Sequence, residues 1–488
     1  MLPRWRECRL FATALVAGCS TSPAAAHTDA AVARDVGHDG GHDGGRDGGR
    51  DGAHDTAGAE ASDTTPRDGA LDARVADVVT VDVTRIDAAP ARSSIEHVVI
   101  IVQENHTFDT YFGRYCTAAA GSSPTCTTGP SCCEAAPATD PSGASPVVLD
   151  DTQNASYRPD NSSACETSEI DDGKMDGFVT GTSCSAPGNF AIAPAALMQT
   201  YHGYAGSYAL ADRYFQPAIG SSSSNDMYLA VAKYVFQDNM MEPQGIGDNC
   251  SIGFQTIYTG QTTVLDLVLA AGYSARYYAE GYAAAKQAAP ACPAPPPGCL
   301  AAIAFDPCDF TPGNVPFDYY SQFNDNPSFM TDLGDFLPDL ARGGLPSVSF
   351  VKLLDYKSEH PGLKDLISVG VTQIDELVQG VLASPYAKST LILLTWDEGG
   401  GFFDHVAPPP SSAVDQQPYG TRIPLLAIGP FAMKNTISHV VMEHSSIVKF
   451  LEWNYTGSTG QLLARDAVVN NIGSLLDPTT TGTTVPSN

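Results

Sequence analysis

The stretch that decides the fold is Thr390–Pro410, TLILLTWDEGGGFFDHVAPPP. Its first seven residues, 390–396, are apolar or β-branched and predict a short strand that is buried on both faces. Asp397 and Glu398 follow directly, and three glycines come next. Because ligands gather at the carboxyl ends of parallel strands, two carboxylates placed there need a bound cation or a shared proton to coexist. A hard metal ion suits a carboxylate pair in a glycine-lined turn better.

A second stretch, far earlier in the chain, has the same organisation. Residues 97–103, HVVIIVQ, again predict a short buried strand, and Glu104 and Asn105 follow it at once. If the two strands are neighbours, Glu104 and Asn105 join Asp397 and Glu398 at one edge of the sheet. We call these four residues the strand-end ligands, because together they offer the oxygen atoms that a divalent metal prefers.

Length and charge limit the classes of function. A chain of 488 residues is long enough for one large α/β domain with accessory segments. Its 26 basic and 55 acidic residues leave a formal net charge of −29. Such acidity argues against binding of nucleic acid and against electrostatic docking on anionic lipid, and it favours binding of cations.

The N-terminus is typical of an exported bacterial protein. Residues 1–18 combine arginines with a short apolar run and resemble a lipoprotein signal peptide, which would leave Cys19 as the lipidated first residue. We therefore expect anchoring to the cell envelope through lipid on Cys19, with an ordinary secretory signal as the alternative. Residues 19–93 contain Gly-rich repeats with a period of four and predict a disordered tether.

The cysteines also indicate export. Of the 12 cysteines, Cys8 lies in the predicted signal peptide and Cys19 is the predicted lipidation site, which leaves ten. An even number in an exported chain predicts up to five disulfides, and no CxxC spacing supports a zinc site instead. Their clustering at 116–184 and 250–308 predicts disulfide-stapled loop insertions in the folded domain.

Residues 94–476 are predicted to form the folded domain, followed by a flexible tail at 477–488. Strands and helices alternate along this segment, which predicts an α/β fold around a largely parallel sheet. Further strands are expected at 274–278, 347–354 and 425–429. Helices are expected at 195–215, 227–236, 262–271, 329–341, 371–383 and 445–453.

Four serines, 221–224, precede the helix expected at 227–236 and include the candidate nucleophile, Ser222. A helix N-terminus favours a bound phosphate through its unpaired N–H groups and its dipole. A serine hydroxyl needs a base or a metal for activation, and no GxSxG elbow surrounds these serines. A serine-rich helix cap is an equal alternative, and the chemistry does not single out one of the four.

Several motifs together are similar to those of the bacterial phosphoesterase family, which includes non-haemolytic phospholipases C and respiratory-burst-inhibiting acid phosphatases. The resemblance covers residues 95–475, and its first two motifs are highly specific. The motifs are IIVQENHTFDTYFG (100–113), DEGGGFFDHVAPP (397–409), YGTRIP (419–424) and EHSS (443–446).

This resemblance implies an alkaline-phosphatase-like three-layer sandwich and a divalent metal on the strand-end ligands. It singles out Ser222 as the nucleophile, which would form a phosphoseryl intermediate, and places Asn225 in the same substrate-binding loop. His360 matches a histidine that contacts the phosphoryl group. His202 is a further candidate for the substrate pocket.

Three more polar residues are expected to support the site without binding the metal. Asp404 is interpreted as a carboxylate behind the ligands, and His405 as a residue that orders the glycine-rich turn. His444 precedes a helix and is either a supporting partner or a simple cap.

The sequence departs from the family pattern at two places. No histidine occurs in 313–320, where many members carry HNPFxYF, and the nucleophile loop has Ser224 and Asp226 in place of the usual Pro and Arg. The expected function is acid-phosphatase-like hydrolysis of phosphate esters. The alternatives are a phospholipase C that acts on phosphatidylcholine or sphingomyelin, and a surface binding protein on a decayed catalytic scaffold.

Overall fold

The computed structural model describes residues 90–250, 253–297, 299 and 308–488. The chain divides into two compact units, 1–80 and 81–488, and every described residue belongs to the second. The predicted signal peptide, Cys19 and residues 19–89 of the predicted tether lie outside the described residues. In the described part of the chain no helix is both long and apolar enough to span a membrane.

The described residues form an eight-stranded sheet with the strand order β12-β4-β11-β10-β1-β9-β7-β8. Strands β10, β1, β9, β7 and β8 are parallel neighbours, whereas β11 runs antiparallel to both β10 and β4. The prediction of a largely parallel sheet is therefore confirmed. The bounds are β1 His97–Gln103, β4 Ala209–Ala211, β7 Ala275–Ala279, β8 Met330–Asp332, β9 Val348–Lys352, β10 Thr390–Trp396, β11 Leu425–Ile428 and β12 Thr436–Ser438.

The two central strands, β1 and β10, have the bounds expected from the sequence. Every residue of β10 is buried, and so is every residue of β1 after His97. Since successive side chains point to opposite faces of a sheet, both faces must be covered. The sheet is consequently the middle layer of a three-layer α/β sandwich, as predicted.

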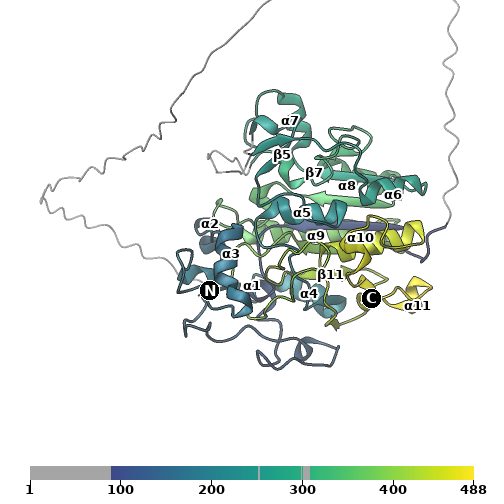
Figure 1. The fold of residues 1–488 in the computed structure, drawn as a ribbon. Coiled ribbons are helices and arrows are strands. Elements are labelled where there is room, and N and C mark those ends of the chain that lie inside the picture. The colour runs from purple at the N-terminus through teal and green to yellow at the C-terminus, as the bar shows by residue number, and fades with distance from the viewer. Residues whose placement is uncertain (1–89, 251–252, 298, 300–307) are drawn as a thin grey trace, which may run out of the picture. The chain divides into compact units, whose positions relative to one another are not determined.

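Helices α5, α6 and α10 pack against one another, and helices α2, α4 and α8 pack against α9. Figure 1 shows α5 beside the yellow helix α10. The helix bounds are α1 Phe108–Phe112, α2 Asp151–Ser156, α3 Ser163–Ile170, α4 Gln199–Ser207, α5 Ser222–Val231, α6 Val264–Ala270, α7 Tyr282–Ala288, α8 Phe336–Arg342, α9 Ile367–Leu382, α10 His444–Leu451 and α11 Pro478–Thr481.

The long loops carry the disulfides and two small parallel strand pairs, β2 (Val147–Val148) with β3 (Ala191–Ile192) and β5 (Met241–Pro243) with β6 (Phe254–Thr256). The described cysteines form five disulfides, as the even count predicted. The pairs are Cys116–Cys133, Cys126–Cys132, Cys165–Cys184, Cys250–Cys292 and Cys299–Cys308.

Three expected segments differ from the structure. The helix expected at 195–215 ends at Ser207, because the buried segment Ala209–Ala211 pairs with β11 and β12 as strand β4. The helix expected at 329–341 begins as β8, which pairs with β7. The tail at 477–488 is not flexible in this structure: it forms α11 and buries Val485 against the core. In each case tertiary packing overrides local preference.

Candidate active site

The candidate site lies at the carboxyl ends of the central parallel strands. Strands β1 and β10 pair in register from His97 opposite Thr390 to Gln103 opposite Trp396, so the residues that follow each strand must meet. The backbone N–H of Asn105 donates a hydrogen bond to Oδ1 of Asp397 over 2.8 Å. The structure thus brings the strand-end ligands together as the sequence predicted.

The backbone at Asn105 explains how two ligands can follow one strand. Asn105 has a φ of 60°, in the left-handed region that asparagine tolerates better than most residues. This conformation directs its N–H to Asp397 and its side-chain amide to the carboxylate of Glu398. Gly400, also left-handed with a φ of 71°, passes so close that a Cβ there would overlap the carbonyl oxygen of Asn105. The glycines therefore permit this close approach.

The site crowds negative charge into a buried space. Burial and the charges of Glu104 and Glu398 raise the pKa of Asp397 well above its usual value, and burial raises the pKa of Glu398 to about 8. Burial also opposes ionisation of Glu104, but the nearby Lys352 ammonium outweighs it and lowers the pKa of that carboxyl. Such a cluster is stabilised by a cation.

Two oxygen atoms support a metal as that cation. Oδ1 of Asn105 and Oδ2 of Asp397 are buried and have no hydrogen-bond donor among the described residues. Buried polar atoms normally have a partner, so these atoms fit the role of metal ligands. A carboxylate-rich oxygen set of this kind suits Mg²⁺, Ca²⁺ or Mn²⁺.

Ser222 is the first residue of α5 and faces the same carboxylates. Its Oγ donates to Oε2 of Glu104 over 3.2 Å. The hydroxyls of Ser221 and Ser224 donate instead to the backbone oxygens of Asn161 and Ser221. Among the hydroxyls of these three serines, that of Ser222 meets a candidate ligand, which agrees with its selection as nucleophile.

The position of Asn225 does not agree with the predicted substrate contact. Its side-chain oxygen accepts from the N–H of Ala218, and its amide group donates to the carbonyl oxygens of Gly220 and Ser221. These bonds use both ends of the amide to fix the loop before Ser222. We therefore interpret Asn225 as a residue that holds the nucleophile loop in place.

His360 lies at the site in a strained loop. The preceding residue, Glu359, has a φ of 72°, which is unfavourable for a residue with a Cβ, and a hydrogen bond from Tyr201 holds its carboxylate. Burial, reinforced by the charge of Arg158, lowers the pKa of His360 to about 3. Its Nδ1 is 2.9 Å from the carbonyl oxygen of Pro361, so Nδ1 carries the proton of the neutral ring and Nε2 is an acceptor.

His444 is buried against Asp397, one of the strand-end ligands proposed from the sequence. It is the first residue of α10, and its Nε2 lies 2.8 Å from the carbonyl oxygen of Asp397. Its Nδ1 lies 2.7 Å from the hydroxyl of Tyr214. His444 thus supports the turn after β10, in line with the expected supporting role.

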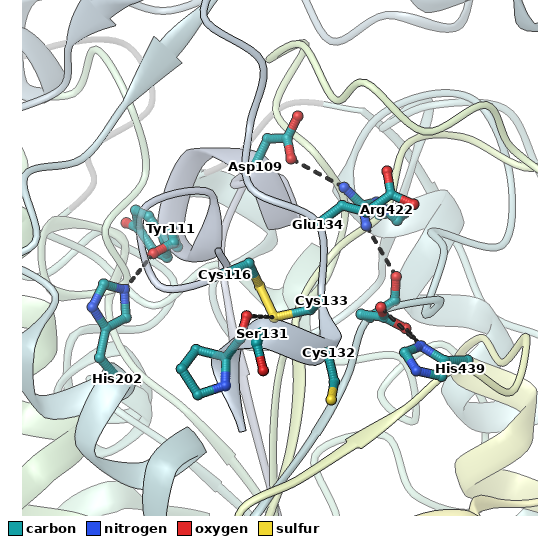
Figure 2. Close-up of a disulfide and its surroundings, with 12 residues drawn as sticks. Asp109, Tyr111, Cys116, Ser131, Cys132, Cys133, Glu134, His202, Arg422 and His439 are labelled. Atoms are coloured by element: carbon teal, nitrogen blue, oxygen red, sulfur yellow. Dashed lines mark hydrogen bonds and ion pairs between the residues drawn. A yellow bond between two sulfur atoms is a disulfide. The ribbon is translucent and has the colours of Figure 1, made fainter. Parts of the chain in front are cut away.

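Asp404 and His405 belong to a buried ion network next to the site. Asp404 accepts from Nε of Arg422, and Arg422 also donates to Asp109 (Figure 2). The ring of His405 lies between Asp109 and Glu134, with a carboxylate oxygen within 2.9 Å of each ring nitrogen. The network holds the turn that follows Asp397 and Glu398, which is the role expected of His405.

The structure does not place His202 in the site. Its Nε2 lies 2.8 Å from the carbonyl oxygen of Tyr111 (Figure 2). Its ring packs against Phe112 and Tyr115. The sequence prediction of a substrate contact is therefore replaced by a packing role between α4 and α1.

Sequence reasoning missed several polar residues of the site. Lys352, at the end of β9, forms an ion pair with Glu104. Asn161 donates to Glu398 over 2.6 Å, and Asn314 donates to Glu104 over 3.1 Å. A charged residue at the end of the apolar run VSFVK was the available signal for Lys352, and the asparagine of the family motif HNPFxYF was the signal for Asn314, whereas Asn161 lies in a long loop without a clear pattern.

The chain is similar in sequence to known phosphoesterases. The model of the phosphoesterase family matches residues 95–456. Phospholipase C B of Mycobacterium tuberculosis is 29% identical over 189 residues, which cover 34% of this chain and 35% of that protein. Non-hemolytic phospholipase C of Pseudomonas aeruginosa is 29% identical over 146 residues, 24% of this chain and 21% of that protein. The chain thus spans about a third or less of these relatives.

Solved structures with a similar arrangement are more distant. An alkaline phosphatase superfamily protein from Vibrio parahaemolyticus matches with a TM-score of 0.32 and 9% identity, covering 75% of this chain and 68% of that chain. A putative sulfatase from Bacteroides thetaiotaomicron matches with a TM-score of 0.37 and 10% identity, covering 80% and 75%. The α/β architecture itself is evident from the sheet described above.

Proposed function

This chain belongs to the phosphoesterase family, and from that membership we propose that it hydrolyses phosphate esters through a phosphoseryl intermediate. The main support for the proposal is one contact: the hydroxyl of Ser222 donates a hydrogen bond to the carboxylate of Glu104, which is one of the strand-end ligands. A hydroxyl at a helix N-terminus beside a metal-binding carboxylate is suited to attack on phosphorus.

We propose that the strand-end ligands hold one or more divalent metal ions. Their unpartnered oxygens and crowded charge support this assignment. When bound, the metal favours ionisation of the seryl hydroxyl and withdraws charge from the phosphoryl group.

The reaction proceeds in two displacements. The Oγ of Ser222 forms a bond to phosphorus while the bond to the leaving oxygen breaks; the seryl proton passes to Glu104, and the leaving alkoxide takes a proton from solvent. A water molecule, oriented by a hydrogen bond to Nε2 of neutral His360, then attacks phosphorus and releases a proton to solvent. The bond to Oγ breaks, Ser222 regains a proton, and inorganic phosphate leaves.

The substrate class is proposed as phosphomonoesters, as in an acid phosphatase. The matched relatives favour a second candidate, since both are named phospholipases C. The two candidates differ in their products. A phosphatase releases inorganic phosphate from a monoester, whereas a phospholipase C releases diacylglycerol from phosphatidylcholine or the corresponding ceramide from sphingomyelin.

The test is hydrolysis of p-nitrophenyl phosphate and of phosphatidylcholine by the purified chain. We expect Ser222→Ala to lower turnover by roughly a thousandfold or more, as removal of a nucleophile does. Ser224→Ala, in the same loop but bonded to Ser221, is the matched control and keeps most activity. A chelator abolishes turnover, and added divalent metal restores it. Full activity of Ser222→Ala refutes the mechanism; metal binding without turnover on any phosphoester indicates the decayed scaffold.

Export is proposed on two grounds. Five disulfides among the described cysteines favour an oxidising compartment. The leader resembles that of a lipoprotein, so Cys19 is the proposed anchor to the envelope, and the membrane is contacted through that lipid. Mass spectrometry of the mature N-terminus tests the lipidation of Cys19, because an acylated Cys19 and a free N-terminus differ by the mass of the acyl chains.

A further inference from the structure

Lys352 is a buried lysine that the mechanism above leaves without a role. It is the last residue of β9, its side chain is 4% exposed, and its ammonium group forms an ion pair with Glu104. Beyond that ion pair, its Nζ has no hydrogen-bond acceptor among the described residues. A lysine ammonium carries three donors, so part of its capacity is unused.

The sheet order fixes Lys352 on one side of Glu104. Strand β1 lies between β9 and β10, so Lys352 approaches Glu104 from the β9 side, whereas Asp397 approaches from the β10 side. The ammonium group therefore comes from the strand on the opposite side of β1 from Asp397.

Ser222 and Lys352 share this carboxylate. Ser222 donates to Oε2 of Glu104, while Lys352 pairs with Oε1. The site therefore holds a hydroxyl and an ammonium group at the two oxygens of one carboxylate. Asn314 donates to the same Oε1 from the segment 313–320, which lacks the histidine of the family motif. The Lys352 ammonium group thus lies next to residues 313–320, the segment that lacks the histidine of the family motif.

The acidic surroundings keep the ammonium group in place and charged. Asp226 lies close enough to affect it electrostatically, and Oδ2 of Asp226 is buried without a hydrogen-bond partner among the described residues. An ammonium held in a site of low dielectric constant stabilises an anion far more than it would in water, provided that the anion can reach it.

We propose that Lys352 binds a non-bridging oxygen of the phosphoryl group during its transfer to and from Ser222. This inference rests on the proposed function and adds a catalytic residue to it. Lys352 supplies a fixed positive charge at Glu104, from the strand opposite to that of Asp397.

The test measures binding of inorganic phosphate by the metal-loaded Ser222→Ala protein, so that turnover is not required. We expect that adding Lys352→Met weakens phosphate binding in isothermal titration calorimetry by roughly tenfold to a hundredfold, as the loss of a charged hydrogen bond does. Lys357→Met is the matched control, because Lys357 pairs with Glu280 near the same strand end, and it leaves phosphate binding unchanged. Metal content, measured by atomic emission, stays the same in all three proteins.

Phosphate binding within twofold of the parent protein, at equal metal content, refutes the role of Lys352. If Lys352→Met does not fold, ε-¹³C-lysine NMR of the wild-type protein replaces it, with Lys352→Arg used for assignment. Phosphate must then shift the Lys352 signal; an unshifted signal at saturating phosphate also refutes the proposal. Failure of the proposed function appears separately, as absence of phosphoester turnover by the wild-type protein.

Discussion

The pH dependence of stability offers a quantitative check on the ion network around His405. Both of its ring nitrogens face carboxylates, Nδ1 towards Asp109 and Nε2 towards Glu134, so both must carry protons. Burial alone would lower the pKa of His405, but the charge and the hydrogen bond of Asp109, with the charge of Asp404, together outweigh it and raise that pKa to about 8. The folded protein therefore binds this proton more tightly than the unfolded chain does.

The magnitude follows from the difference between the two states. A rise from the usual 6.5 to about 8, at about 1.4 kcal/mol per pH unit, corresponds to about 2 kcal/mol of stability. Because the folded-state pKa is raised, this contribution is fully present below the unfolded value of 6.5. It is lost as the pH rises through about 8.

The assay is urea unfolding of the wild-type protein and of His405→Gln at about pH 6 and about pH 9. Buried carboxyl groups that do not contact His405 titrate alike in both proteins and cancel in the difference between them. We expect the stability advantage of the wild-type protein to be larger by about 2 kcal/mol at the lower pH. An advantage that is equal at both pH values, or larger at the higher one, refutes a charged His405 in the folded state.

Three further predictions concern the stability of the fold and, for Gly400, the affinity for metal. Arg422→Met leaves two buried carboxylates without their partner and should lower the free energy of unfolding by about 3–5 kcal/mol in urea. Arg342→Met removes an arginine whose side chain is 67% exposed and should lower it by less than about 1 kcal/mol. Equal losses in the two variants contradict the buried network. Gly400→Ala should weaken metal binding by at least about tenfold in calorimetry, since a Cβ there displaces the turn; unchanged affinity argues against that turn. Replacing Cys116 and Cys133 together by serine opens a loop of sequence separation 17 and should cost about 3 kcal/mol; a stable double variant shows that packing alone holds the loop.

The central part of the fold could be predicted because its signals are local. Residues 97–103 and 390–396 are continuous apolar runs of strand length, and both became strands with these bounds. The short edge strand β8 could not be recognised in this way. Its three residues, Met330–Asp332, form a strand because β7 provides a partner, and pairing of that kind is invisible in a local pattern.

The residues of the candidate site that could be predicted are likewise those with a local sequence signal. The strand-end ligands were predicted because each follows directly after a readable strand. Asn225 and His202 were misassigned because a residue type alone does not say whether its hydrogen bonds are used locally. The amide of Asn225 is consumed by its own loop, and His202 bonds to the backbone of Tyr111. Lys352 was missed because a lysine at a strand end usually reaches solvent, whereas here Glu104 holds it inside.

The central position of β1 affects how the chain can acquire activity. This strand is made first among those of the sheet, but both of its partners, β9 and β10, are synthesised about 250–290 residues later. Until they emerge, an apolar segment without neighbours must stay unpaired and prone to aggregation. The candidate site therefore assembles late, after nearly the whole polypeptide is available. This order suits the proposed export, because the site is complete only after β10 has been made.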